Sequence, residues 1–143
     1  MDYERYADGE ALLGWVNMEA RVSLAGDPGS WLQKVGEEIA ESLDEKGHEV
    51  GHFKMSLRGK GKRWRIHQVM GGEDVELIEE NLGDGVGGRP ELRLLVNLRA
   101  EGDAVILQEI VRGVLEGQKE AEIDYREEAA FQPGKPVPVH RIA

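Results

Sequence analysis

The sequence contains no cysteine among its 143 residues. Disulfide bonds and metal sites built from thiolates are therefore excluded. Long apolar runs are also missing, since no stretch approaches the roughly 20 residues that a helix needs to cross a bilayer. The N-terminal segment MDYERYADGE is polar and acidic, unlike a signal peptide. We expect a cytoplasmic protein with no membrane partner.

Basic residues are scarce relative to acidic ones. The chain has 18 lysine and arginine residues against 28 aspartate and glutamate residues, which gives a net charge of −10. This total argues against a general affinity for nucleic acid, because binding to phosphate backbones needs a basic surface. The length and the 40% content of hydrophobic residues fit one packed domain.

Two kinds of apolar spacing divide the chain into elements. Alternation of apolar and polar residues predicts strands, and apolar residues three or four apart predict amphipathic helices. Asp27, followed by Pro28, fits the start of the first helix, because its side chain can accept hydrogen bonds from free backbone amides. The predicted strands lie near residues 12–24, 50–57, 63–69, 73–81, 91–100 and 121–129, and the predicted helices cover 27–47 and 103–117.

The order of these elements predicts an α+β domain. Two strand–helix–strand units flank an extra hairpin, which is typical of a ferredoxin-like sandwich with an antiparallel sheet and both helices on one face. We predict a flexible arm over residues 1–11, a single domain over 12–130 and an extended proline-rich tail over 131–143. In the last strand, alternation places four apolar residues on one face, namely Ala121, Ile123, Tyr125 and Ala129.

The two halves of the chain share a short motif. Asn17 in the first strand and Asn97 in the later strand each follow a valine and stand three residues before an alanine. An old duplication would place the two asparagines at related positions. Chance similarity explains so short a match equally well.

A cluster of basic residues stands out in this acidic chain. It joins Trp64 with cations that are close in sequence, and the binding candidates among its residues and their neighbours are Arg58, Lys62, Arg63, Arg65 and His67. Such a cluster can bind a phosphate group, a nucleotide or an acidic partner surface. The alternative is a solvated hairpin tip whose charge is balanced by the acidic run over residues 73–80.

The histidines do not form an obvious metal site. His48 and His52 are four apart, but on a strand that spacing separates them by about 13 Å, too far to share one ion. His67 and His140 stand alone in the sequence. No Ser/His/Asp set or catalytic carboxylate pair can be singled out. The sequence therefore identifies no catalytic residue and no cofactor.

Two segments are candidates for contact with a partner. The polar side of the first strand carries Trp15, Asn17 and Arg21, and an exposed sheet face of this kind suits pairing with a second copy. The tail combines spaced prolines with an aromatic and basic end, in the residues Phe131, Pro133, Pro136, Pro138, His140 and Arg141. An extended tail of this composition can pack on its own domain or on a neighbouring chain.

The tail also carries a family resemblance. The segment FQPGKPVPVHR, residues 131–141, resembles the closing motif of cobalamin-synthesis (CobW-type) GTPase-related proteins. VGHFK over residues 50–54 and LVNLRA over residues 95–100 look like two strands of the same family. The resemblance covers about residues 12–142, but only these short motifs are close. Ala130 stands where the family pattern has a cysteine, which weakens a transferred metal role.

The resemblance implies an accessory C-terminal domain standing alone. In that family the GTPase half carries a phosphate loop and a cysteine-containing metal motif, and this chain has neither. We therefore expect a non-catalytic interaction domain linked to metal or cobalamin handling, which forms a homodimer or works with a separate P-loop GTPase. The alternative is a small-ligand or metal-binding domain that uses the basic cluster with His52, His67 or His140.

Overall fold

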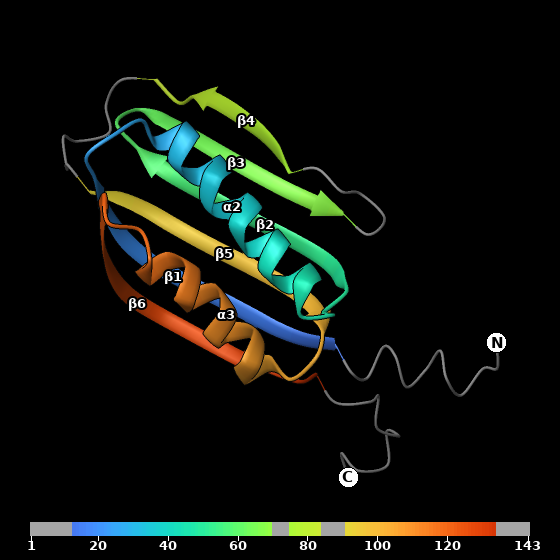
Figure 1. Cartoon of the computed structure of the whole chain (residues 1–143). Coiled ribbons are helices and arrows are strands. Elements are labelled where there is room, and N and C mark those ends of the chain that lie inside the picture. Colours follow the sequence, from blue (N-terminus) through green and yellow to red (C-terminus); the bar gives the residue numbers. More distant parts are fainter. Residues whose placement is uncertain (1–12, 70–74, 84–90, 134–143) are drawn as a thin grey trace, which may run out of the picture.

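Six strands form one antiparallel sheet, and two helices pack on one of its faces (Figure 1). The computed structural model describes residues 13–69, 75–83 and 91–133. The elements in chain order are β1 (Leu13–Leu24), α2 (Pro28–Glu45), β2 (Val50–Gly59), β3 (Lys62–Val69), β4 (Glu76–Asn81), β5 (Leu92–Glu101), α3 (Ala104–Glu116) and β6 (Ala121–Phe131). The predicted α+β class is confirmed, and the predicted arm over residues 1–11 lies outside the described residues.

The strands lie side by side in the order β4-β3-β2-β5-β1-β6. Strands β2, β3 and β4 follow one another in the sequence and pair as neighbours. Strand β1 instead lies between β5 and β6, the last two strands of the chain. The helices α2 and α3 make the connections from β1 to β2 and from β5 to β6.

Both helices begin at the aspartates that the sequence indicates. The side chain of Asp27 accepts a hydrogen bond from the backbone amide of Ser30 at 2.8 Å. Asp103 accepts from the amide of Val105 at 2.9 Å and from that of Ile106 at 3.3 Å. These bonds satisfy backbone donors that have no partner inside the first turn of a helix. The caps therefore fix where each helix starts above the sheet.

The core lies between the helices and the sheet. One face of β1, β2, β3 and β5 and the inner stripes of both helices supply its buried apolar side chains. The predicted stripe of α2 is fully buried, in the residues Leu32, Val35, Ile39 and Leu43. Neither of the helices described is long and apolar enough to span a membrane.

The prediction for the face of Ala129 is wrong. The pairing of β1 with β6 shifts by one residue, because Glu19 lies opposite Glu127 whereas Ala20 lies opposite Tyr125. The extra residue, Arg126, forms a β-bulge that reverses the alternation along the rest of β6. Ala130 therefore packs against the core in place of Ala129, while Ala121, Ile123 and Tyr125 do so as predicted.

Candidate functional site

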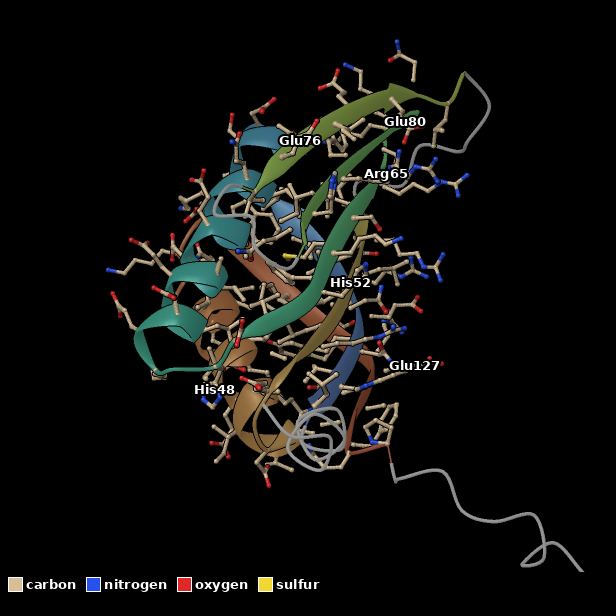
Figure 2. The ribbon with its side chains drawn as sticks, turned by 90° about the vertical axis from the view of Figure 1, so that its right-hand side faces the viewer. His48, His52, Arg65, Glu76, Glu80 and Glu127 are labelled. Carbon is tan, nitrogen blue, oxygen red and sulfur yellow. The ribbon has the colours of Figure 1, made fainter. Side chains whose placement is uncertain are left out.

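The sheet has a second face that neither of the two described helices covers, which we call the open face. Figure 2 shows the helices on the left and the side chains of this face projecting to the right, many of them tipped with nitrogen. Alternation along each strand places polar residues there, since their neighbours in sequence are buried in the core. The open face is thus the broad surface on which the candidate residues must be placed.

Positive charge gathers on the four inner strands of the open face. Two acidic residues, Glu19 and Glu101, accompany seven lysine and arginine residues on these strands. Acidic residues of the two edge strands flank this area, among them Glu80 on β4 and Asp124 on β6. The seven cations are Arg21, Lys54, Arg58, Arg63, Arg65, Arg93 and Arg99.

Four of these arginines lie in one line across the sheet, which we call the arginine row. Arg58 on β2 lies directly opposite Arg63 on β3 and directly opposite Arg93 on β5. Arg93 in turn lies opposite Arg21 on β1. Directly opposed residues of antiparallel strands have their Cβ atoms about 4.5–5.5 Å apart, so neighbouring side chains of the row are within reach of one ligand.

Two members of the arginine row have carboxylate partners. Arg63 donates two hydrogen bonds to Glu80, at 3.0 and 3.3 Å, and Arg93 donates two to Glu19 at the same distances. Hydrogen bonding from these arginines holds the pKa of Glu80 and the pKa of Glu19 below the usual value of 4.5. Both carboxylates therefore stay charged at neutral pH.

The other two members of the arginine row have no ion-pair partner. Within the described part of the chain, neither Arg58 nor Arg21 has a carboxylate oxygen within 4.0 Å. Arg58 is exposed, and Arg21 is half-buried and lies opposite Asp124 on β6. The surplus of positive charge in the row is therefore greatest at Arg58.

Four of the five residues of the predicted basic cluster lie together on the open face. Arg65 shares Glu80 with Arg63 through a 2.9 Å bond, and His67 lies 3.9 Å from Glu76. Arg58, Arg63, Arg65 and His67 lie on the open face, where β4 supplies acidic partners for all of them except Arg58. The alternative interpretation, in which the acidic run balances the charge of the basic residues, therefore describes most of this cluster.

Lys62, the remaining candidate of this group, lies on the other side of the sheet. Its ammonium donates to Glu79 on the helix side of the sheet, where Glu79 also accepts a 2.8 Å bond from the indole of Trp64. The cause is the two-residue turn at Lys60 and Gly61, both with positive φ, which pairs Gly59 with Lys62 and so sets the alternation of β3.

Aromatic residues close one end of the open face. The guanidinium of Arg99 lies 4.0 Å from the ring centroid of Trp15, and the ring of Phe131 lies 5.6 Å from the same indole. Phe131 remains 41% exposed. Because Arg99 covers the face of the Trp15 ring, that ring is not a free platform for stacking a ligand.

The two asparagines of the repeated motif are direct neighbours. Asn17 lies opposite Asn97 in the pairing of β1 with β5, and both side chains are exposed on the open face. The motif therefore marks equivalent places on two adjacent strands. This is the outcome expected if the halves are related, and it puts two amide groups near the middle of the open face.

The predicted tail is only partly within the described residues. Pro133 is half-buried, whereas Pro136, Pro138, His140 and Arg141 lie outside the described residues. Gln132 ties the end of β6 to the domain, since its side chain accepts from the amide of Ala104 at 2.7 Å and donates to the carbonyl of Leu13 at 3.0 Å. The strand and this anchor reach past residue 130, where the tail was predicted to begin.

No metal site emerges from the described residues, because no three histidine or acidic side chains among them are grouped to hold an ion. His52 and His67 both lie on the open face, and His140 is outside the described residues. Burial lowers the pKa of His52, and the nearby charges of Arg99 and Lys54 lower it further. These effects favour the neutral form of His52.

A concave feature lies on the helix side of the sheet. An open groove of about 600 Å³ runs between α2 and α3, with Ile106, Ile110 and Gly113 among its lining residues. The amide of Gln118 crosses this region, donating to Glu38 at 3.1 Å and to the carbonyl of Val114 at 2.8 Å. These bonds satisfy the amide donor of Gln118 within the protein. The arginine row, in contrast, contains side chains that have no carboxylate partner, so we place the candidate site there.

Sequence reasoning missed Arg93 and Arg99 as candidate residues. Both alternate with fully buried residues of β5, and this alternation was the available signal that they project from the open face.

Comparison with protein-family models, curated proteins and solved structures gave no match to this chain.

Proposed function

We propose that this chain is a non-catalytic interaction domain whose open face binds a partner protein. The proposed role is that of the accessory C-terminal domain of CobW-type proteins, in metal or cobalamin handling. The observation that carries the interaction proposal is a sheet face that neither of the described helices covers, on which Trp15, Asn17, Arg21 and Phe131 of the predicted partner set all lie.

The strand order supports a ferredoxin-like core for this domain. Strands β1 and β2 are both antiparallel to β5 and lie on either side of it, so the β1-α2-β2 unit straddles one strand. The β5-α3-β6 unit straddles β1 in the same way. The proposed core is thus β2-β5-β1-β6, with β3 and β4 added beside β2.

The open face is large enough for a stable complex. Six strands spaced about 4.8 Å apart and roughly seven residues of each strand cover about 700 Å² in projection. One partner of a standard protein interface contributes about 800 Å². A partner that covers the open face would therefore bury an area of ordinary size for a specific complex.

Charge favours a different protein over a second copy as the occupant. For two copies packed face to face, a two-fold axis along the strands stacks Arg58 on Arg93 and Arg63 on Arg21. An axis across the strands stacks Arg93 on Arg99. Such juxtapositions of like charge oppose association. A separate P-loop GTPase is the proposed partner, and the homodimer expected from the sequence stays a prediction.

Two matched substitutions test the interaction proposal. Leu95→Glu places a charge at a half-buried position in the middle of the open face, and Val105→Glu does the same at an exposed position of α3. We expect Leu95→Glu to weaken binding to a purified P-loop GTPase of the same genome by at least about tenfold, since burying an unpaired carboxylate costs more than about 1.4 kcal/mol. Val105→Glu should bind as the wild type does.

Binding is measured by surface plasmon resonance, with light scattering of the free chain beside it. If the wild type is a monomer that binds none of the GTPases, the interaction proposal fails. A dimer that Leu95→Glu dissociates and Val105→Glu leaves intact would replace the GTPase with a second copy. Equal loss in both variants would place the contact away from the open face.

A further inference from the structure

We propose that the arginine row is a binding site for the polyphosphate group of a compact ligand. The row consists of Arg63, Arg58, Arg93 and Arg21, which face one another in sequence across β3, β2, β5 and β1. The proposal goes beyond the interaction with a GTPase, because it concerns a small ligand. The arginine row lies on the same open face and shares Arg21 with the proposed partner contacts, so the two occupants would compete.

Strand pairing places the four arginines of the row side by side although their charges repel one another. Like charges directly opposite one another in a sheet are destabilising, and this row contains three such contacts between its four members. Glu80 and Glu19 relieve Arg63 and Arg93, but no carboxylate among the described residues relieves Arg58. An anion placed over Arg58 would have an arginine on each side, because the Cβ atoms of Arg63 and Arg93 lie about 4.5–5.5 Å from that of Arg58.

A phosphate fits this arrangement better than a further carboxylate. A carboxylate offers two oxygens and one negative charge, and the Arg93–Glu19 pair shows that one guanidinium fork already uses both oxygens. A phosphate group offers at least three oxygens and a charge of about −1.5 to −2 at neutral pH. It can therefore accept from Arg58 and from a neighbouring arginine of the row at the same time.

The ends of the arginine row limit the size of the ligand. Three steps between strands make the row about 14 Å long. Glu80 lies beyond Arg63 at one end, and Asp124 lies beyond Arg21 at the other. These carboxylates would repel a polyanion that continued past the row. A compact polyphosphate spans the interior of the row, whereas a long nucleic acid would cross both acidic edges.

The aromatic residues at one end of the open face also favour a compact ligand over a nucleic acid. Binding of a single-stranded nucleic acid relies on aromatic faces that stack on successive bases. Among the described residues of the open face, the aromatic side chains are Trp15 and Phe131, and Arg99 already lies over Trp15. Recognition at the arginine row is thus expected to depend on charge and hydrogen bonds to phosphate oxygens.

Isothermal titration with defined anions tests the site. The probes are tripolyphosphate, ATP, citrate as a carboxylate of comparable charge, and a single-stranded oligonucleotide. We expect tripolyphosphate to bind and citrate to bind at least about tenfold more weakly. A charge-assisted hydrogen bond contributes about 1.5–3 kcal/mol, so Arg58→Gln should weaken tripolyphosphate binding by about 10–100-fold. Lys46→Gln, an exposed change beside α2, is the matched control and should bind normally.

Each outcome decides the proposal. ATP binding as tightly as tripolyphosphate assigns recognition to the phosphates alone, and tighter binding of ATP adds contacts from the nucleoside; both support the site. Absence of tripolyphosphate binding, or equal affinities of Arg58→Gln and Lys46→Gln, overturns it. Tighter binding of the oligonucleotide also overturns the compact ligand, in favour of a nucleic acid. Circular dichroism of Arg58→Gln confirms that this exposed substitution leaves the fold intact.

Discussion

Gly14 lies where β1 passes close to the start of α3. A Cβ added at this position would stand 2.7 Å from the carbonyl oxygen of Gly102, 2.8 Å from Cδ1 of Leu107 and 3.0 Å from Cα of Ala104. Two of these three neighbours are backbone atoms, which cannot move aside without shifting the loop or the helix. The absence of a side chain at Gly14 is therefore a packing requirement of the domain.

A pair of glycine substitutions tests this requirement. Gly14→Ala should lower the free energy of unfolding by about 1–3 kcal/mol, the usual cost of overpacking. Gly113→Ala is the control, because no atom lies within 4 Å of its added Cβ inside α3, and alanine should stabilise the helix by about 0.5–1 kcal/mol. Chemical denaturation followed by tryptophan fluorescence measures both. Equal effects of the two changes would contradict the packing account.

The errors of sequence reasoning at single residues have one physical origin. Ala129 was assigned to the wrong face, and Lys62 was grouped with residues that lie on the other face. Each follows a point where the chain departs from plain alternation. A tight turn precedes Lys62 and a bulge precedes Ala129. One residue more or less at such a point moves every later side chain to the other face. Spacing alone does not reveal these departures.

The elements themselves were predictable because their signals are local. Helix caps at Asp27 and Asp103 and alternation in the strands depend on residues close in sequence. The arginine row was not predictable in this way. Arg58, Arg93 and Arg21 come from three separate strands, and only the pairing of those strands brings the side chains into line.

At the level of the strands, the arginine row carries a cost in stability. Arg58→Thr removes a cation that has like charges on both sides and replaces it with a residue that favours strands. We expect the free energy of unfolding to rise by about 0.2–1 kcal/mol at low salt, and the gain to shrink at high salt as the repulsion is screened. Urea denaturation at two ionic strengths measures both effects.

Arg63→Thr serves as the comparison for that prediction. It breaks the two hydrogen bonds to Glu80, so it should stabilise the protein less than Arg58→Thr or destabilise it. If Arg58→Thr lowers stability at low salt, the arginine row is a favourable structural feature of the free protein and the account of its cost is wrong.

Across the whole molecule, charge is segregated between the two layers. The outer side of α2 carries acidic residues, whereas the inner strands of the open face carry mostly basic ones. A net charge of −10 therefore does not describe either face. The expectation that nucleic acid does not bind was drawn from this total, and it stays a prediction that the oligonucleotide titration tests.

The acid stability of the molecule should fall in two separate steps. The pKa of His52 is lowered from 6.5 by burial, so the unfolded chain takes up this proton first and stability is lost as pH falls below about 6.5. The pKa values of Glu19 and Glu80 are lowered from 4.5 by their arginine partners, and their contribution is lost as pH falls below about 4.5. Thermal melting across this range measures both steps.

The variant His52→Gln should remove the upper step and keep the lower one. Replacing Glu80 with glutamine should keep the upper step and reduce the lower one, since it leaves His52 in place and removes one of the carboxylates whose pKa is lowered. An upper step that persists in His52→Gln would assign it to another group.

The position of β1 sets the time at which the chain can finish folding. Both of its neighbours, β5 and β6, are synthesised after it, and β6 begins only at residue 121. At about 5–20 residues per second, the completed β1 waits roughly 5–20 s for its outer neighbour to be made. Until β5 is made, β1 has no neighbouring strand to pair with, while β2, β3 and β4 can already pair. The growing chain thus exposes the apolar face of β1 before its neighbours are made, and it depends on the ribosome's surroundings to keep that strand from other chains.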